Sequence, residues 1–368
     1  MNDNIITPNY NITPDTAHYL ENLDRQLWLI ENLLLMPKHE AWIRREIQIR
    51  RAVGTTRIEG ATLDEDAVRG LEGLGAGAKV TEDERANINA LQAYEFIDFL
   101  SDQPDIPIDE LVIRQLNRYF MNGAADTLTP GTYRKGSNKV GEFVTPDQGD
   151  VPALMRSFAM WLREDDGELH PVIKAGLAHI HLVAIHPFWD GNGRTARGLT
   201  TLILQRSAFG FKKLLSLESQ LFEIRDDYFS AIEHALGREF SLGYDASRWL
   251  EFFALTVDIH SSQLAASLTD WQRMMQDTYK IFAEKGWNQR QADAFAFASQ
   301  AGKITRGDYM EITGVSPVTA SRDLAALVKA ELFTAEGKTR RRIYRPVPLD
   351  PNKKVKIPEE QLPLISNQ

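Results

Sequence analysis

Apolar residues recur at helical spacing through most of this chain, and the pattern predicts a mainly α protein. A long helical stretch is expected to begin at Thr13-Pro14-Asp15 and to reach past Arg51, and a glycine-rich break from Gly70 to Gly77 follows it. Further helices with the same spacing are expected over residues 86–99, 108–120, 151–162, 175–185, 228–236 and 246–275. One short run, Asn138 to Val144, has strand-like composition around a glycine. The pattern therefore predicts an all-α bundle with one small hairpin.

The pattern changes between about Gln289 and Pro346. A short helix, a turn over 313–316 and a second helix with Pro317 at its first position are followed by two short strands around the basic run 340–345. This region resembles a winged helix-turn-helix domain. If it binds DNA, the helix over 316–330 enters the major groove and the wing contacts phosphates. A protein-interaction module on the same fold is the alternative, because a fold does not fix a function.

The chain has 368 residues, too many for one small core, and we expect three parts. These are an N-terminal helical domain over 1–78, a core over 79–285, and the winged domain with its tail over 286–368. The absence of cysteine excludes disulfides, cysteine-based zinc sites and cysteine nucleophiles. A net charge of -9 argues against a protein that coats nucleic acid, although it leaves room for a local basic patch. The start at Met1 lacks the pattern of a signal peptide, and no apolar stretch is long enough to span a bilayer, so we expect a cytoplasmic protein with no membrane partner.

The run from His186 to Arg197, HPFWDGNGRTAR, gathers the groups needed to hold a polyphosphate and move a proton beside it. Pro187 disfavours the α conformation at His186, so the preceding helix should end there with the imidazole at a helix-to-loop junction. Gly191 and Gly193 permit a turn whose successive N–H groups bind an anion, and a second helix is expected to begin near Arg194 with its positive end at the same place.

Three charged side chains in this run suit phosphate chemistry. Arg194 and Arg197 lie three residues apart on one face of the second helix, where both guanidinium groups can bind phosphate oxygens. Asp190 supplies a hard oxygen ligand suited to Mg²⁺, which usually binds through one carboxylate plus substrate phosphates.

The run resembles the signature of the Fic family, His-x-Phe-x-Asp/Glu-Gly-Asn-Gly-Arg-x-x-Arg, and matches it at every specified position. Members of that family are mostly AMP transferases that use ATP to modify hydroxyl side chains of proteins. The resemblance implies a Fic-type helical bundle with a hairpin flap, ATP as co-substrate and Mg²⁺ held by Asp190. It makes His186 the general base that takes the proton from a Ser, Thr or Tyr hydroxyl of a target protein. The residues that it places around the nucleotide are Val140, Gly141, Glu142, Phe143, Asp190, Gly191, Asn192, Gly193, Arg194, Thr195, Arg197 and Tyr228.

Gly193 distinguishes between activities within the family. A relative that phosphorylates its target carries a bulky basic residue at this place and binds the nucleotide turned around. A small residue leaves room for the β- and γ-phosphates, so the resemblance favours attack on the α-phosphate and transfer of AMP. Transfer of another nucleotide or of phosphocholine uses the same motif and remains an alternative.

The segment Thr55-Thr56-Arg57-Ile58-Glu59-Gly60 resembles the family's inhibitory motif, Ser/Thr-x-x-x-Glu-Gly/Asn. The resemblance implies that Glu59 pairs with Arg197 and occupies the space that the γ-phosphate needs. The alternative is a surface glutamate that ends a helix before Gly60.

The run from Pro130 to Arg134 has turn chemistry, and with the hairpin over 138–144 it resembles the family's flap. There an extended target segment adds as a strand, so main-chain bonds present its hydroxyl. Tyr228 and Phe229 fall where the family often has aromatic residues near the adenine, although packing alone also explains them. The second functional hypothesis is a DNA-binding transcriptional regulator whose core only senses nucleotide. Binding of DNA through the winged domain and formation of a homodimer both stay open.

Overall fold

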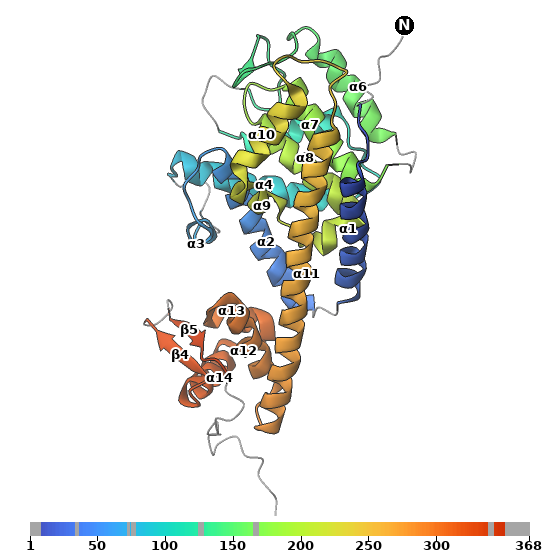
Figure 1. Ribbon diagram of the computed structural model, residues 1–368. Helices are drawn as coiled ribbons and strands as arrows, with labels where there is room; N and C mark the ends of the chain where they lie inside the picture. The colour runs from blue at the N-terminus through green and yellow to red at the C-terminus, as the bar shows by residue number, and fades with distance from the viewer. Residues whose placement is uncertain are drawn as a thin grey trace, which may run out of the picture. The chain divides into compact units, whose positions relative to one another are not determined.

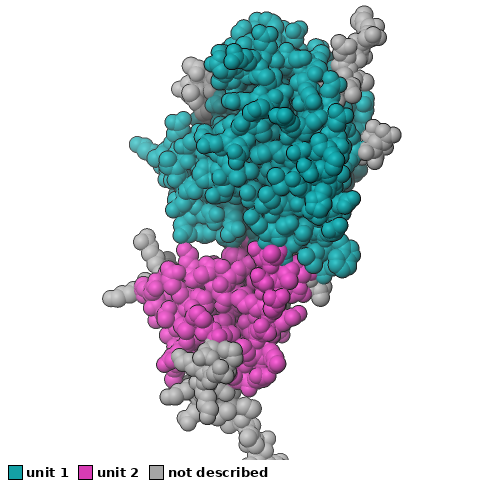
Figure 2. All heavy atoms as spheres, viewed as in Figure 1, with its two compact units in different colours: residues 1–32, 43–265 teal, residues 33–42, 266–368 magenta. Residues whose placement is uncertain are grey.

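A computed structural model describes residues 9–33, 37–71, 74, 79–123, 129–164, 169–337 and 342–349. The chain forms two compact units (Figures 1 and 2). Unit 1 contains residues 1–32 and 43–265, and unit 2 contains residues 33–42 and 266–368. No helix among the described segments is long and apolar enough to cross a bilayer.

Unit 1 is a helical bundle whose elements follow one another along the chain (Figure 1). They are α1 (Pro14–Asn32), α2 (Pro37–Ile58), α3 (Glu65–Arg69), α4 (Glu82–Ser101), α5 (Glu110–Phe120), β1 (Lys139–Val140), β2 (Phe143–Val144), α6 (Val151–Arg163), α7 (Pro171–Ile185), α8 (Asn192–Arg206), the 3-10 helix η1 (Ala208–Lys213), α9 (Leu217–Glu223), α10 (Arg225–Leu236) and α11 (Ser247–Glu284). Two helices, α2 and α11, have residues in both units. The prediction of a mainly α fold with one small hairpin is confirmed.

The pair α7 and α8 forms the centre of unit 1. The α7 helix is apolar all round and almost wholly buried, as expected for a helix covered on every side. The α8 helix packs against α7 on one side and against α4 and α5 on others. The loop between α7 and α8 is therefore held at both ends by buried helices.

The expected stretch from Thr13 past Arg51 is two helices rather than one. The second helix begins at Pro37, because proline lacks the N–H that a continuing helix requires and disfavours helical backbone in the residue before it. Near the end of α2, a Cβ on Gly54 would lie 2.6 Å from backbone atoms of Glu218 and Ser219, so α2 packs closely on the start of α9.

The predicted three-part division stays a prediction, and the compact units group the residues in another way. Residues on both sides of the expected boundary at 78 belong to unit 1, because α1 and the end of α2 bury apolar side chains such as Leu23 and Val53 in it. Unit 2 takes up the chain again after residue 265, since the last part of α11 contributes Phe282 to its core.

In its described residues, unit 2 combines α12, α13, α14 and the last part of α11 with a three-stranded antiparallel sheet of order β3-β5-β4. Its elements are α12 (Gln289–Ala301), β3 (Ile304–Thr305), α13 (Arg306–Thr313), α14 (Pro317–Lys329), β4 (Phe333–Glu336) and β5 (Ile343–Pro346). The predicted helix, turn and second helix lie at the expected residues, with Gly314 in the left-handed conformation at the turn. The assignment of a winged domain stays a prediction, and Arg340 and Arg341 of the expected wing lie outside the described residues.

Candidate active site

His186 lies directly after α7, at the helix end that Pro187 predicts. Its backbone adopts the left-handed conformation, with φ 48° and ψ 58°, and its N–H donates to the Leu182 carbonyl. The ring Nδ1 lies 3.3 Å from the Val183 carbonyl oxygen, so a neutral imidazole that donates from Nδ1 keeps the Nε2 lone pair available. Burial lowers the pKa of His186 to about 4, against the opposing effect of the Val183 bond. The ring is therefore neutral at pH 7 and able to accept a proton.

The loop after His186 is held by the side chain of Asn192. Its Oδ1 accepts the Phe188 N–H at 2.9 Å, and its Nδ2 donates to the Phe188 carbonyl oxygen at 2.8 Å. Both polar atoms of the Asn192 side chain are engaged in these two bonds. Asn192 can therefore contribute its backbone N–H, rather than its side chain, to an anion site.

The N-terminus of α8 is the place of the expected anion site, whose role stays a prediction. Gly191 has a φ of 77°, and a Cβ there would lie 2.6 Å from Met121, so only glycine fits this turn. The first-turn N–H groups of Asn192, Gly193 and Arg194 have no acceptor within the helix and carry the positive end of its dipole. Asp190 stands beside them half-exposed, and its Oδ1 accepts the Gly191 N–H at 2.5 Å and lies 3.5 Å from Arg194.

A buried asparagine on α5, which was not among the predicted site residues, supports this turn. Asn117 donates to the Asp190 carbonyl oxygen at 2.9 Å and to the Thr195 hydroxyl at 3.2 Å, and it accepts the Gly131 N–H at 2.8 Å. The available signal was an amide on the otherwise apolar face of the predicted helix 108–120. Thr195 is fully buried and donates to the Gly191 carbonyl, so its side chain holds the loop rather than facing a nucleotide.

Arg197 is buried on α8 and binds the end of α2. Its Nε donates to the Thr55 hydroxyl at 2.9 Å, and one terminal nitrogen donates to the Thr55 carbonyl at 3.1 Å. The same nitrogen lies 2.5 Å from Oε1 of Glu59. Burial raises the pKa of Glu59, but the charges of Arg197 and Arg194 outweigh it and hold this pKa below its usual value. The Glu59 carboxylate is therefore ionised at neutral pH.

The same carboxylate lies against the anion site. A Cβ built on Gly193 would be 2.8 Å from Oε1 of Glu59 and 3.1 Å from Arg197. The structure thus brings Glu59, Gly193 and Arg197 together. The Glu59 carboxylate lies beside Gly193, in the space that the β- and γ-phosphates were expected to occupy. Arg225 fixes this end of α2 from another side, since its Nε donates to the Ile58 carbonyl at 2.8 Å.

Tyr228 does not lie at the surface of the site. It is 1% exposed, and its hydroxyl lies 2.9 Å from Nε2 of His179, which is itself fully buried. The prediction that Tyr228 contacts the adenine does not fit a ring packed inside the bundle. An aromatic residue at helical spacing belongs to the core here, which is the alternative that the sequence left open.

The flap is a two-stranded antiparallel hairpin in which Val140 pairs with Phe143 around Gly141. Val140 and Glu142 are exposed, whereas Phe143 is buried. Val144 also forms a parallel bridge to Glu239 outside the hairpin. Because β2 is paired on both sides, β1 is the strand of this described hairpin whose outer edge can receive another strand.

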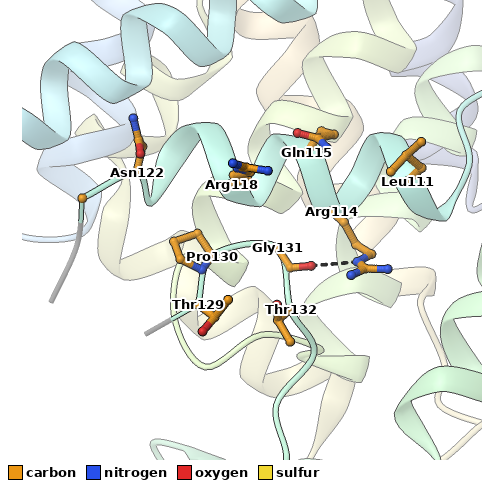
Figure 3. A pocket seen from close by; sticks show the side chains of 10 residues that line it. Leu111, Arg114, Gln115, Arg118, Asn122, Thr129, Pro130, Gly131 and Thr132 are labelled. Atoms are coloured by element: carbon orange, nitrogen blue, oxygen red, sulfur yellow. Dashed lines mark hydrogen bonds between the residues drawn. The ribbon is translucent and has the colours of Figure 1, made fainter. Parts of the chain in front are cut away.

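A cavity of about 600 Å³ lies between α5 and the segment 129–132 (Figure 3). Figure 3 shows Leu111, Arg114 and Arg118 on α5 above this segment, and Arg114 donates to the Gly131 carbonyl at 2.7 Å. Residues Thr129, Pro130 and Thr132 also line a smaller space that reaches Trp189 and Asp190. The segment 129–132 therefore forms part of the wall of both spaces.

A model of the Fic/DOC family matches residues 107–204, which include α5, the flap, α7 and most of α8. The chain contains a Fic domain. The protein adenylyltransferase Fic of Drosophila yakuba is 42% identical over 106 residues, which are 28% of this chain and 21% of that relative. The corresponding protein of Drosophila virilis is 44% identical over 98 residues, 26% of this chain and 20% of the relative. The chain spans about a fifth of the length of these curated relatives.

Two solved structures share the fold. A Fic family protein from Desulfovibrio desulfuricans G20 gives a TM-score of 0.62 at 23% identity, covering 94% of this chain and 99% of that one. Residues 134–508 of Fic-1 from C. elegans give a TM-score of 0.58 at 23% identity, covering 70% and 73% of the two chains. The helical arrangement around the Fic domain is therefore that of known Fic proteins.

Proposed function

We propose that this chain is a protein adenylyltransferase that transfers AMP from ATP to a Ser, Thr or Tyr hydroxyl of a target protein. The observation that supports it best is the placement of a neutral His186, with Nε2 available, one loop away from the anion site at the start of α8. A protein that only senses nucleotide needs the anion site and the arginines but not this base. The names of the Drosophila relatives support the same activity.

In the proposed reaction the target hydroxyl oxygen forms a bond to the α-phosphorus of ATP. His186 takes the hydroxyl proton at Nε2, the bond from the α-phosphorus to the bridging oxygen breaks, and pyrophosphate leaves. The N–H groups at the start of α8 and the Arg194 guanidinium hold the phosphates and stabilise the charge that develops on them. Catalysis rests on positioning and charge stabilisation, and the flap supplies the edge of β1 to the target backbone.

The donor set of the site fits Mg²⁺. Asp190 offers a hard, half-exposed carboxylate beside the phosphate site, and the described residues contain no group of three or more metal-binding side chains. Such a site binds Mg²⁺ through one carboxylate together with phosphate oxygens and water, which is its usual coordination. When bound, the metal neutralises phosphate charge.

Glu59 makes the resting enzyme auto-inhibited in this proposal. Its carboxylate takes the Arg197 nitrogen that a γ-phosphate would otherwise bind and lies against Gly193. ATP then binds in a pose that does not react. Release requires only that the end of α2 move away from Arg197.

The identity of the transferred group is tested with the full chain carrying Glu59→Gly. This variant is incubated with ATP labelled at the α-phosphate, with ATP labelled at the γ-phosphate and, separately, with labelled CDP-choline. Transfer of the α-label alone supports the proposal. Transfer of the γ-label would indicate a kinase, and transfer of label from CDP-choline a phosphocholine transferase. Either result overturns AMP transfer.

Binding of DNA by unit 2 is a second candidate function. The first turns of α14 expose Val318 and Arg322 one helical turn apart, as in a helix that reads base edges. Unit 2 holds 17 Lys and Arg against 13 Asp and Glu, although the whole chain carries a net charge of -9. Fluorescence anisotropy with a labelled duplex tests it: affinity that falls with salt and with Arg322→Ala supports binding, and the absence of binding at low salt excludes it.

A further inference from the structure

Arg134, a buried arginine between the turn at 130–133 and the flap, donates hydrogen bonds in two directions. Toward the loop after α7, its Nε donates to the His186 carbonyl at 2.9 Å, and its backbone N–H donates to the Pro187 carbonyl at 2.9 Å. Toward the flap, its terminal nitrogens donate to the carbonyls of Gly136 at 2.8 Å and Pro146 at 2.6 Å. One guanidinium therefore joins His186 to both ends of the hairpin.

The carbonyl that Arg134 binds belongs to a residue in an unusual conformation. Left-handed backbone is uncommon for residues other than glycine and persists where the surroundings fix it. His186 has this conformation, and Arg134 holds its carbonyl oxygen in place. The flap rests on the same loop, since a Cβ on Gly136 would lie 2.9 Å from the ring of Trp189.

The charge of Arg134 also acts on the imidazole. None of the four acceptors of its hydrogen bonds is a carboxylate. Burial has the larger effect on the pKa of Arg134 and lowers it, although the charge of Asp147 raises it. Burial and the charge of Arg134 both lower the pKa of His186, whereas Glu59 and Asp190 raise it. Arg134 thus favours the neutral ring that a general base needs.

We propose that Arg134 is the positioning residue of the active site, which fixes the flap and the His186 imidazole relative to one another. It acts through these two elements and touches no reacting atom. The inference rests on the proposed function, because the distance between the flap and the base matters only if a flap-bound hydroxyl loses its proton to His186. Preorganised sites depend on such supporting contacts, and small misplacements of reacting groups are costly.

The test compares Arg134→Lys, Arg134→Gln and a matched control, Arg51→Lys. The lysine keeps the positive charge but cannot make all three side-chain bonds, whereas the glutamine loses the charge. Arg51 is equally buried and also donates to backbone carbonyls, of Leu215 and Lys213, at 2.9 Å each. It does not contact the flap or His186, so the control reports the cost of disturbing a buried arginine elsewhere.

The first measurement is an NMR titration of histidine-labelled full chain, with the His186 signal assigned by its loss in His186→Ala. We expect Arg134→Gln to raise the pKa of His186 and both Lys variants to leave it at the parent value. The second measurement is self-modification with labelled ATP in the Glu59→Gly background. Arg134→Lys should lower its rate about 10²-fold, because the flap loses its anchor, while Arg51→Lys should lower it much less.

If the pKa of His186 is unchanged in Arg134→Gln, or shifts equally in Arg51→Lys, the charge of Arg134 does not specifically keep the His186 ring neutral. A parental transfer rate in Arg134→Lys would overturn the positioning part of the inference. Should Arg134→Gln not fold, the comparison of the two Lys variants still decides positioning. The titration requires no transfer, so the absence of any labelled product from the Glu59→Gly parent would count against the proposed function and leave the titration readable.

Discussion

The Glu59 carboxylate lies 2.5 Å from the guanidinium of Arg197, across 138 residues of sequence. Arg197 is 1% exposed, and Thr55, one turn before Glu59 on α2, accepts two further hydrogen bonds from it. A buried arginine needs such partners, and ATP would offer it another anion. In the proposed mechanism, the state of the active site therefore depends on the position of the end of α2.

Thr55→Val should weaken this inhibitory contact without removing the carboxylate. The change leaves the Arg197 Nε unpaired and buried, which costs about 1–3 kcal/mol of folding stability. We expect self-modification with labelled ATP to rise, though less than in Glu59→Gly. Thr56→Val is the control, because the Thr56 hydroxyl donates to the Ala52 carbonyl and to Asn87 rather than meeting Arg197. Equal activity in both variants and the parent would contradict the proposed role of Thr55.

His186→Ala in the Glu59→Gly background should abolish most transfer and spare ATP binding. Removal of a general base lowers rates by about 10²–10⁴-fold, while the anion site at the start of α8 does not include the imidazole. Transfer is followed with α-labelled ATP and binding by calorimetry. A His186→Ala protein that modifies itself at the parent rate would refute the proposed base.

Stability should fall as the pH drops from 6.5 toward 4. Burial lowers the pKa of His179 and His181 to about 3, and burial lowers the pKa of His186 and His260 to about 4. Between these values and the ordinary pKa near 6.5, the unfolded chain binds more protons than the folded one. Each histidine then lowers the free energy of unfolding by up to about 1.4 kcal/mol per pH unit.

Urea denaturation at pH 7, 6 and 5 measures this dependence. His181→Gln should flatten it, since one of the four buried rings is removed. An unfolding free energy that is the same at pH 7 and pH 5 would show that these rings are not held neutral by burial.

The helices and the chemistry of the loop after α7 could be predicted from the sequence, because both depend on local patterns. Apolar spacing, Pro187 and the glycines of the run 186–197 determine where α7 ends and α8 begins. Only family resemblance indicated the pairing of Glu59 with Arg197, since no local pattern brings together residues so far apart. Burial was the main source of error: Tyr228 has the spacing of a site residue, but it packs against His179 in the core.

The polar side chains that support the site could not be predicted either, because their hydrogen-bond partners are distant in the sequence. The polar atoms of the Asn117 side chain find their partners elsewhere in the chain, at Gly131, at Asp190 on the loop and at Thr195 on α8. A single amide in an amphipathic helix gives no indication of such partners. The same holds for Arg134, because its acceptors at Pro146, His186 and Pro187 become neighbours only in the folded chain.

Asn117→Leu tests that support. The substitution keeps the side-chain volume close but leaves the Gly131 N–H and the Asp190 carbonyl without a partner, which costs about 1–3 kcal/mol for each buried group. We expect a lower melting temperature together with reduced transfer in the Glu59→Gly background. A transfer rate equal to that of the parent, measured well below the melting temperature, would show that the loop holds its shape without Asn117.

The most direct test of the account is the transfer rate of Glu59→Gly relative to the parent and to Glu46→Gly. Glu46 lies within α2 and pairs with Arg69 at 2.5 Å, so its replacement removes a paired carboxylate of this helix without touching Arg197. We predict that Glu59→Gly alone raises incorporation of α-labelled AMP and that adding Arg197→Ala removes the gain. Equal incorporation by the parent, Glu46→Gly and Glu59→Gly would contradict auto-inhibition by Glu59.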